Sequence, residues 1–348
     1  MSARVLSVGT ACPSHTVTQE ESKAFAANFF AGSLPALARL LPAFDNTRIE
    51  QRHLVRPVSW YAQPHTFAEK NAVYCEAALE LSTRAAEKAL DRACVAPGDV
   101  DSVVFVSSTG IRTPSLDGAL IERLGLPRSA VRLPVWGLGC AGGAAGVARA
   151  ADLVVARRKP VLLVATEVCS ATFVHGDRTR ANLIATALFG DGAAAAVLGP
   201  QEGGLQVTGS VSRLLEDSED VMGWSVVNEG LRVRFARSIP GIVRAVVPQL
   251  REQAASTVGL GPEAFHRFVL HPGGAKVLEA YEEALCVDTH ALHDAYDVLR
   301  TCGNMSSPTV LFVLERLLHN LPNTAGTGLM LGLGPGFSAE GVVLQWTP

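Results

Sequence analysis

The sequence predicts an α/β protein built from two similar halves. Short apolar runs typical of buried strands alternate with longer helical stretches along the 348 residues. In each half, a strand is followed by a glycine, a helix and two further strands. The glycine-rich segment 200–204 is the expected boundary, which gives units of residues 1–200 and 201–348. This repetition predicts a pseudo-twofold axis between the halves.

Each element follows from a local pattern of apolar residues and turn residues. The first half has predicted strands at residues 5–8, 100–107, 131–136, 160–166 and 190–197, and predicted helices at residues 68–93 and 141–155. The second half has predicted strands at residues 265–271, 327–333 and 340–344, and an apolar helix that starts near Asn304 and runs to Leu318. Strand 100–107 matches strand 265–271, and Gly139-Cys140 matches Gly303-Asn304.

Composition narrows the class of protein. Hydrophobic residues make up 48% of the chain, enough for a large core, and the net charge of −3 gives no reason to expect nucleic acid or an anionic membrane as a partner. We find no secretion-signal pattern and no run near the roughly 20 apolar residues that span a bilayer. The seven cysteines are odd in number and lack a Cys-x-x-Cys pair, which predicts a cytoplasmic protein without structural zinc.

Cys140 lies in Gly-Leu-Gly-Cys-Ala-Gly-Gly, between a predicted strand and a predicted helix. A helix N-terminus favours a thiolate, so the position suits a nucleophile. Cysteine is also a common small core residue. A third interpretation is a dinucleotide site, because residues 137–142 fit G-x-G-x-x-G and Glu167 ends the next strand.

Two distant segments favour the nucleophile. His271 ends a strand in His-Pro-Gly-Gly, and Asn304 follows a glycine before an apolar helix. Alone, the histidine would be structural and the asparagine a helix cap. With Cys140 they supply a nucleophile, a proton-exchanging group and an amide donor. The duplication would place Cys140 and Asn304 at equivalent helix starts that face each other, and a dinucleotide site explains neither segment.

These residues resemble the type III polyketide synthases, the chalcone synthase-like branch of the thiolase fold, over nearly the whole chain. The matching strings are Gly139-Cys140, Ala187-Leu-Phe-Gly-Asp-Gly192, His271-Pro-Gly-Gly274, Gly303-Asn-Met-Ser-Ser307 and Gly332-Leu-Gly-Pro-Gly336. The resemblance implies duplicated α-β-α-β-α layers and a homodimer. It also implies that Cys140 accepts an acyl group from acyl-CoA. His271 and Asn304 then hold the enolate formed when malonyl-CoA loses carbon dioxide. No metal or cofactor is implied beyond the CoA thioesters.

The resemblance also implies pocket and CoA residues. Phe189 matches the aromatic gatekeeper of the family, for which plain core packing is the alternative. The other substrate-binding candidates are Cys169, Thr172, Val233, Ser306, Gly334, Pro335 and Gly336. The CoA-binding candidates are Arg39, Asn46, Arg48, Gly273, Gly274 and Lys276, for whose charged members a solvated surface position is the alternative.

Three positions depart from the plant pattern of the family. Ala141 and Val233 stand where aromatic residues are usual, and Asn46 replaces a lysine. These changes suit bacterial relatives that extend fatty acyl starters to alkylpyrones or alkylresorcinols, and they predict a roomy pocket. The alternatives are a ketoacyl synthase III-like enzyme that performs a single condensation, and a non-catalytic acyl-binding protein.

Overall fold

A computed structural model describes residues 2–35 and 37–347. Its nine-stranded sheet has the order β11-β12-β13-β8-β1-β7-β6-β4-β5. The strands of this sheet are β1 (Ala3–Ala11), β4 (Ser102–Val106), β5 (Val131–Val135), β6 (Val161–Val168), β7 (Asp191–Gly199), β8 (Leu205–Leu214), β11 (Arg267–Leu270), β12 (Gly326–Gly334) and β13 (Ser338–Trp346). Two hairpins stand apart from it, β2 (His15–Thr18) with β3 (Gln51–Leu54), and β9 (Met222–Val227) with β10 (Gly230–Phe235).

The pairing of the strands repeats in the two halves. In the first half β4 runs parallel to β6, and β6, β7 and β1 then pair antiparallel. In the second half β11 runs parallel to β12, and β12, β13 and β8 then pair antiparallel. β1 and β8 join the halves through the short pairing of Ala3 to Val5 with Leu205 to Val207. The predicted pseudo-twofold repeat is therefore present.

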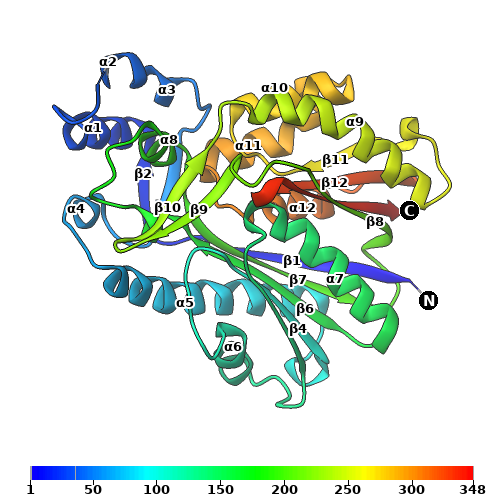
Figure 1. Cartoon of the computed structure of the whole chain (residues 1–348). Coiled ribbons are helices and arrows are strands. Elements are labelled where there is room, and N and C mark those ends of the chain that lie inside the picture. Colours follow the sequence, from blue (N-terminus) through cyan, green and yellow to red (C-terminus); the bar gives the residue numbers. More distant parts are fainter. Residues whose placement is uncertain (1, 36, 348) are drawn as a thin grey trace.

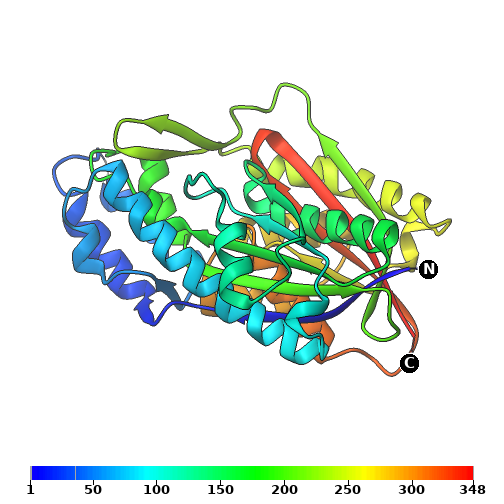
Figure 2. The same ribbon diagram turned by 90° about the horizontal axis from the view of Figure 1, so that it is seen from below.

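The helices cover the faces of the sheet in three layers and also build one end of the molecule (Figure 1). They are α1 (Gln19–Phe29), α2 (Leu37–Leu40), α3 (Pro42–Asp45), α4 (Val58–Tyr61), α5 (Phe67–Ala93), α6 (Leu116–Leu124), α7 (Gly142–Arg157), α8 (Arg180–Leu188), α9 (Ile239–Thr257), α10 (Ala275–Leu285), α11 (His293–Cys302) and α12 (Thr309–His319). α7 and α12 touch each other and strands of both halves, so they form the middle layer. α5 and α6 cover the outer face of the first half, and α9 to α11 cover that of the second half (Figures 1 and 2).

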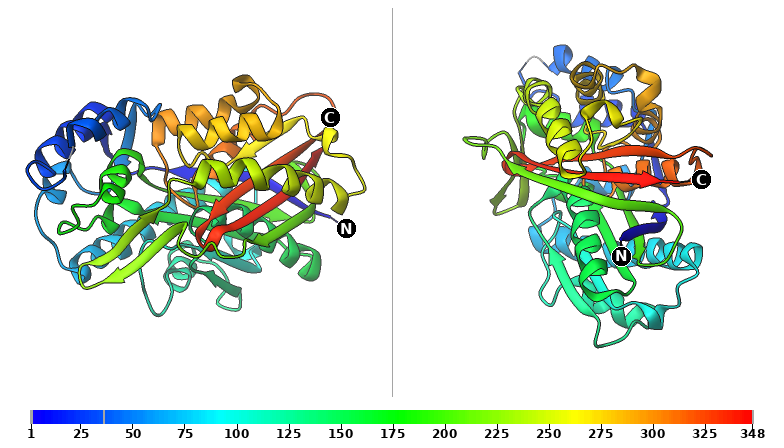
Figure 3. Two further views of the ribbon diagram at one scale, coloured as in Figure 1. Left: turned by 45° about the horizontal axis from the view of Figure 1, so that its top comes forward. Right: turned by 90° about the vertical axis from the view of Figure 1, so that its right-hand side faces the viewer.

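The end of the molecule opposite both chain termini is built from shorter elements (Figure 1). The helices α1 to α3 and the hairpin β9–β10 lie there, and α8 contacts both α1 and β10. Figure 3 shows α9, by contrast, lying across β13 near the termini. The candidate site lies near the N-terminal ends of α7 and α12, between the end built from short elements and the end that carries the chain termini.

Several predicted boundaries are wrong by a few residues, and the shifts matter for the site. The helix expected near Asn304 begins at Thr309, because Ser306 has a positive φ of 59° and Pro308 cannot donate a helical hydrogen bond. α7 begins at Gly142, after a 3-10 turn at Gly139–Ala141. Cys140 and Asn304 therefore lie in the loops before the paired helices rather than on their first turns.

The segment Gly139–Arg157 is long and apolar enough to cross a membrane by length and composition alone. Arg149 and Asp152 interrupt it, so it is not a continuous apolar run of the kind that the sequence analysis excluded. In the structure, two thirds of its 18 most apolar consecutive residues are buried, and α7 packs between strands of both halves. Its composition is explained by its place in the middle layer, where a helix is surrounded by protein on nearly every side.

Candidate active site

Cys140 lies in the 3-10 turn between β5 and α7. The turn needs Gly139, whose φ is +46° and where a Cβ atom would lie 2.7 Å from Cδ of Pro335. The Cys140 side chain is half-buried, and its Sγ lies 3.5 Å from Oγ of Ser306 and 4.0 Å from Oδ1 of Asn304. The fold thus brings together three candidate residues from the two halves of the chain.

The Asn304 side chain is fixed by two backbone contacts. Its Oδ1 accepts a hydrogen bond from the backbone N–H of Ser306 at 2.8 Å. Its Nδ2 donates to the carbonyl oxygen of Gly273 at 3.1 Å. The Asn304 backbone forms an isolated bridge with Phe189, so the asparagine loop and the predicted gatekeeper lie side by side. One amide N–H of the buried side chain remains available to a substrate.

His271 follows β11 and is 2% exposed. Neither ring nitrogen has a hydrogen-bond partner among the described residues, although buried polar groups usually have one. Burial lowers the pKa of His271 to about 3, so the imidazole is neutral at physiological pH. The Gly273 contact of Asn304 connects the two side chains through the loop after the histidine. A neutral imidazole with free nitrogens suits a substrate that brings its own hydrogen-bonding atoms.

The Cys140 thiol is neutral as well. Burial raises the pKa of Cys140 to about 11, and contacts with Ser306 and Asn304 offset only part of this effect. The expectation that the helix end supports a thiolate is therefore not met, because desolvation outweighs the nearby dipoles. Cys140 and His271 are thus both neutral, and attack by the sulfur requires transfer of the thiol proton.

The segments that build the site pack so closely that there is no room for a side chain between their backbones. A Cβ atom at Gly143 would lie 2.3 Å from the carbonyl oxygen of Ser307, and one at Gly142 would lie 2.6 Å from Cγ1 of Val106. A Cβ atom at Gly334 would lie 2.8 Å from Cβ of Ala141. Glycines at these points allow the Cys140 turn, the asparagine loop and β12 to touch.

Sequence reasoning missed the role of Glu167. This residue lies inside β6 and is fully buried, so it does not hold a ribose as the dinucleotide interpretation required. It accepts hydrogen bonds from the Ser108 backbone at 2.9 Å, the Thr109 hydroxyl at 2.7 Å and the Ser307 hydroxyl at 2.8 Å. Oγ of Ser108 in turn accepts hydrogen bonds from the backbone of Gly137 and Gly139. Glu167 therefore connects the loops that carry Cys140 and Asn304.

A narrow cavity of about 70 Å³ lies beside these residues. Its lining includes four of the predicted pocket residues, Cys169, Thr172, Phe189 and Val233, together with Val17, Phe25, Leu54, Val58, Tyr61 and Phe173. The remaining lining residues are Ala185 and the polar Ser22, Arg52, Ser170, Asn182 and Thr186. More than half of the lining is aliphatic or aromatic, so the cavity is suited to a mainly apolar group. Gly334 and Pro335 instead pack near the turn of Cys140 and shape the site from the other side, whereas Gly336 faces Leu214.

The structure does not support the prediction of a roomy pocket, because other groups fill the space of the missing aromatic rings. Ala141 is fully buried against the backbone of β12, so the space of the missing ring is taken by Gly332 and Gly334. Val233 does line the cavity, but Trp224 pairs with it across the β9–β10 hairpin. The Trp224 ring centroid lies 5.9 Å from that of Phe189, and the Phe235 centroid lies 5.6 Å from it. Neighbouring rings thus occupy the gatekeeper region.

Arg52 is a second residue that sequence reasoning missed. Its guanidinium is buried and donates to the carbonyl oxygens of Thr186 at 2.5 Å and Phe189 at 3.3 Å, and to the Ser22 hydroxyl. The arginine therefore fixes the C-terminal end of α8, on which Phe189 follows directly. A lone arginine in a short strand gives no sequence signal for this task.

Only some of the predicted CoA-binding residues lie close together. Arg48 is exposed, stacks 4.7 Å from the ring centroid of Tyr296 and pairs with Glu279 at 3.6 Å. Glu279 lies one turn after the exposed Lys276 on α10, so Arg48 and Lys276 are neighbours. The other candidates are Arg39 in α2, Asn46 after α3, and Gly273 and Gly274 in the loop before α10. Among the described residues, no ion pair or cation–π contact connects Arg39 with Arg48 or Lys276.

Comparison with known proteins places this geometry in a family. The N-terminal domain of chalcone and stilbene synthases matches residues 1–202, and the C-terminal domain matches residues 206–348. A putative chalcone synthase of Bacillus subtilis is 39% identical, over 99% of each chain. A 1,3,6,8-tetrahydroxynaphthalene synthase of Streptomyces peucetius is 37% identical, over 98% of this chain and 93% of the relative.

The solved structures agree. The 1,3,6,8-tetrahydroxynaphthalene synthase of Streptomyces coelicolor, described as a bacterial type III polyketide synthase, superposes with a TM-score of 0.95. The two proteins are 30% identical, and the match covers 99% of each chain. The predicted thiolase-like architecture is thereby confirmed. The chain belongs to the chalcone and stilbene synthase family and is a type III polyketide synthase, an acyltransferase that performs decarboxylating condensation.

Proposed function

We propose that this enzyme loads an aliphatic acyl-CoA starter on Cys140, extends it with malonyl-CoA, and cyclises the product to a pyrone or resorcinol. The proposal is supported by the contact of Cys140 with Asn304, and by the bond of Asn304 to the loop that follows the buried His271, beside a mainly apolar cavity. The mainly aliphatic and aromatic lining suits an alkyl chain. Each methylene transferred from water to such a lining contributes about 0.8 kcal/mol.

In the proposed loading step, His271 acts as the base, because its imidazole is neutral. The Cys140 sulfur attacks the thioester carbonyl of the starter while the imidazole of His271 accepts the thiol proton. The bond between the carbonyl carbon and the CoA sulfur breaks, and the CoA thiolate leaves with that proton. The acyl group then resides on Cys140, and its alkyl chain occupies the cavity.

Extension uses the hydrogen-bond donors left free in the structure. The thioester oxygen of malonyl-CoA accepts hydrogen bonds from His271 and from the second amide N–H of Asn304. Loss of carbon dioxide leaves an enolate, whose negative charge these donors stabilise. The enolate carbon attacks the acyl carbon on Cys140, the carbon–sulfur bond breaks, and the Cys140 thiolate regains a proton.

Incubation with a panel of substrates tests the proposal. We expect products of several extensions from octanoyl-CoA and dodecanoyl-CoA with malonyl-CoA, identified by mass spectrometry, and little product from coumaroyl-CoA. An aromatic product from malonyl-CoA alone, in equal yield with or without acyl-CoA, would contradict the acyl starter. A single extension that requires malonyl-ACP would instead favour the ketoacyl synthase alternative.

We also infer that the enzyme is a cytoplasmic homodimer. Trp136 and Ile111 are 56% and 47% exposed, and Trp136 directly follows the edge strand β5. Large exposed apolar side chains beside an unpaired edge are typical of an interface, and a second copy of the chain would cover both. The seven cysteines are all free, which suits a reducing compartment.

A further inference from the structure

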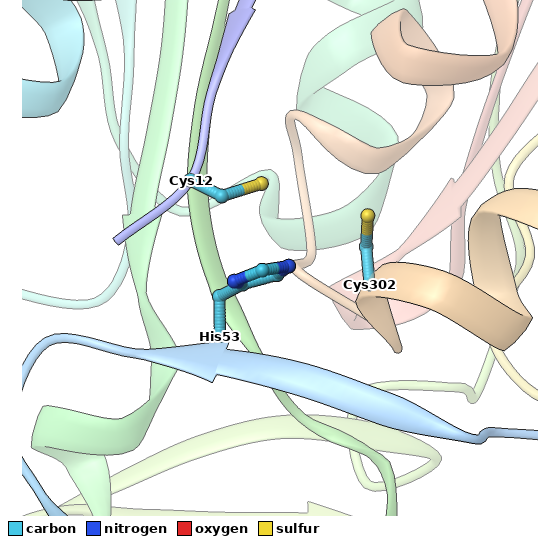
Figure 4. Close-up of side chains that lie close together, drawn as sticks. All are labelled: Cys12, His53 and Cys302. Atoms are coloured by element: carbon cyan, nitrogen blue, oxygen red, sulfur yellow. The ribbon is translucent and has the colours of Figure 1, made fainter. Parts of the chain in front are cut away.

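A cluster of metal-ligating side chains lies outside the condensation site, where three distant segments meet. Cys12 follows the end of β1, His53 lies in β3, and Cys302 is the last residue of α11. Their ligand atoms all lie within 4.8 Å of one another. Figure 4 shows the two sulfur atoms and the imidazole converging on a common space. We call these three side chains the Cys-His-Cys cluster.

The chemistry of the cluster matches zinc. Zinc bonds are about 2.3 Å to sulfur and about 2.0–2.1 Å to nitrogen, so tetrahedral neighbours lie roughly 3.4–3.8 Å apart. A contraction of about 1 Å, within reach of side-chain rotation, would therefore close the cluster around an ion. Thiolate and imidazole ligands favour zinc over magnesium or calcium. Three protein ligands leave the fourth position to water.

The backbone holds the ligands toward one another. Thr16 pairs with His53 in the β2–β3 hairpin, and its Oγ1 lies 3.5 Å from Nδ1 of the histidine. In the proposed site Nδ1 keeps this contact and Nε2 binds the ion, an arrangement typical of metal-binding histidines. The backbone at Cys302 is equally restrained, because a Cβ atom at Gly190 would lie 2.6 Å from the Cys302 carbonyl oxygen.

Burial and charge also suit a cation. Cys302 is buried, whereas Cys12 and His53 are half-buried, so an ion can enter from the surface. Two thiolates and a neutral imidazole cancel the charge of a divalent cation, and their deprotonation releases two protons to solvent. We propose that the Cys-His-Cys cluster binds one thiophilic divalent cation, zinc in the cell, which clamps β1, β3 and α11 together.

The clamp lies directly behind the condensation site. Asn304 is two residues after Cys302, and its backbone donates to the Leu188 carbonyl and accepts from the N–H of Gly190. A bound ion would thus restrain the loop that presents Asn304. The proposal rests on the geometry of the cluster and not on the proposed function. The cysteine spacing gave no sign of it, because its ligands are 41 and 249 residues apart (12 to 53, and 53 to 302).

Cobalt titration tests the site without any measurement of activity. The full chain is used in a Cys140→Ala background, so that the Cys140 sulfur cannot contribute a thiolate-to-cobalt band. We expect a thiolate-to-cobalt charge-transfer band that saturates at one Co²⁺ per chain and disappears on addition of one equivalent of Zn²⁺. Protein purified without chelator should carry about one zinc per chain, measured by elemental analysis. Absence of the band together with absence of zinc would overturn the proposal.

Single variants assign the ligands. Cys12→Ser, His53→Ala and Cys302→Ser should each weaken Co²⁺ binding by at least tenfold, whereas the exposed controls Cys94→Ser and Cys286→Ser should leave it unchanged. Unchanged binding in His53→Ala would contradict the proposed ligand set. A disulfide between Cys12 and Cys302 that forms in air and is unaffected by excess Zn²⁺ would show a redox pair instead.

A measurement on the unaltered chain remains available if a variant fails to fold. Zn²⁺ should slow alkylation of Cys12 and Cys302 by iodoacetamide at least tenfold and leave Cys94 and Cys286 unaffected, as read by peptide mass spectrometry. Equal protection of all four thiols, or of none, would contradict a specific site.

Discussion

Asn304 donates an amide hydrogen to the carbonyl oxygen of Gly273 at 3.1 Å, which connects it to the loop that carries His271. One hydrogen of the Nδ2 group thus orients the side chain, and the other remains for the substrate. The Asn304 oxygen faces the Cys140 sulfur at 4.0 Å. The same amide therefore meets the acyl carrier on one side and the histidine loop on the other.

Asn304→Ala should separate decarboxylation from loading. Removal of one oxyanion donor typically slows a reaction about 100- to 1,000-fold. We expect a loss of this size in the release of carbon dioxide from malonyl-CoA, measured with labelled substrate. Self-acylation of Cys140, measured by intact-protein mass spectrometry, should be largely retained. Asn304→Asp keeps the shape and lacks the donor, so it should match the alanine variant. Normal decarboxylation in both variants would exclude Asn304 from this step.

Cys140 should carry the acyl group. A starter acyl-CoA should add one acyl mass to the wild-type chain, and Cys140→Ala should abolish the adduct. Cys169→Ala is the matched control, because Cys169 lines the same cavity but is buried and lies off the Asn304 loop. An adduct that maps to Cys169 or Cys302 would contradict the assignment.

Alkylation of Cys140 should depend strongly on pH. Burial raises the pKa of Cys140 to about 11, so between pH 6 and pH 9 the thiolate fraction increases about tenfold per pH unit. The iodoacetamide rate at this residue, followed by peptide mapping, should increase in the same way and should not level off below pH 9. A plateau near neutral pH would show that His271 or the end of α7 stabilises the thiolate.

Glu167→Gln should reduce the pH dependence of stability. Burial raises the pKa of Glu167 to about 7. The folded state therefore binds this proton more tightly than the unfolded state, so the contribution of Glu167 to stability decreases as pH rises from about 4.5 to 7. Urea unfolding at pH 5 and pH 8 should show a smaller difference in the glutamine variant, by an amount on the order of 2 kcal/mol. Identical differences would contradict the raised pKa.

Val233→Phe should shift the starter preference to shorter chains. Val233 lines the narrow cavity, and an added ring would overfill it, at a cost of about 1–3 kcal/mol when a long chain is bound. We expect turnover of dodecanoyl-CoA relative to acetyl-CoA to decrease about tenfold. Val226→Phe, at a 70% exposed position in the same hairpin, is the control. An unchanged ratio would show that the acyl chain lies elsewhere.

Trp136→Glu should weaken the homodimer. Light scattering of the wild type at micromolar concentration should give twice the 36.6 kDa of one chain, and the variant should approach a single chain. Val226→Glu, on the hairpin away from β5, should remain dimeric. A wild-type mass of one chain would contradict the proposed interface.

The sequence predicted the parts of the fold that depend on local pattern. Helix α5 was placed to within one residue, because its apolar face is regular and Thr66 with Glu69 forms a capping box. The apolar runs of β4, β6 and β11 were equally clear, since buried strands need continuous apolar residues. The repeated order of elements predicted the duplication, and thereby the meeting of Cys140 with Asn304.

Features that depend on tertiary contact were beyond the sequence. The start of α12 was misplaced because the positive φ of Ser306 is imposed by the packing of the asparagine loop. Trp224 was missed because only the pairing of β9 with β10 places it opposite Val233. Residues 12–66 had no predicted elements, since short helices and a four-residue hairpin carry little periodicity. The tasks of Glu167 and Arg52 likewise depend on partners far away in the chain.

Gly143 has a consequence for how such enzymes diversify. A side chain there would meet the Ser307 carbonyl at 2.3 Å, so no carbon atom fits between the two halves at this point. A chimaera that joins the N-terminal half of one relative to the C-terminal half of another at residues 200–204 would bring together two surfaces. These surfaces have to fit each other closely enough for backbone atoms to touch. Variation in product is therefore easier to reach through the hairpin and α8, which lie around the cavity, than through the junction between the halves.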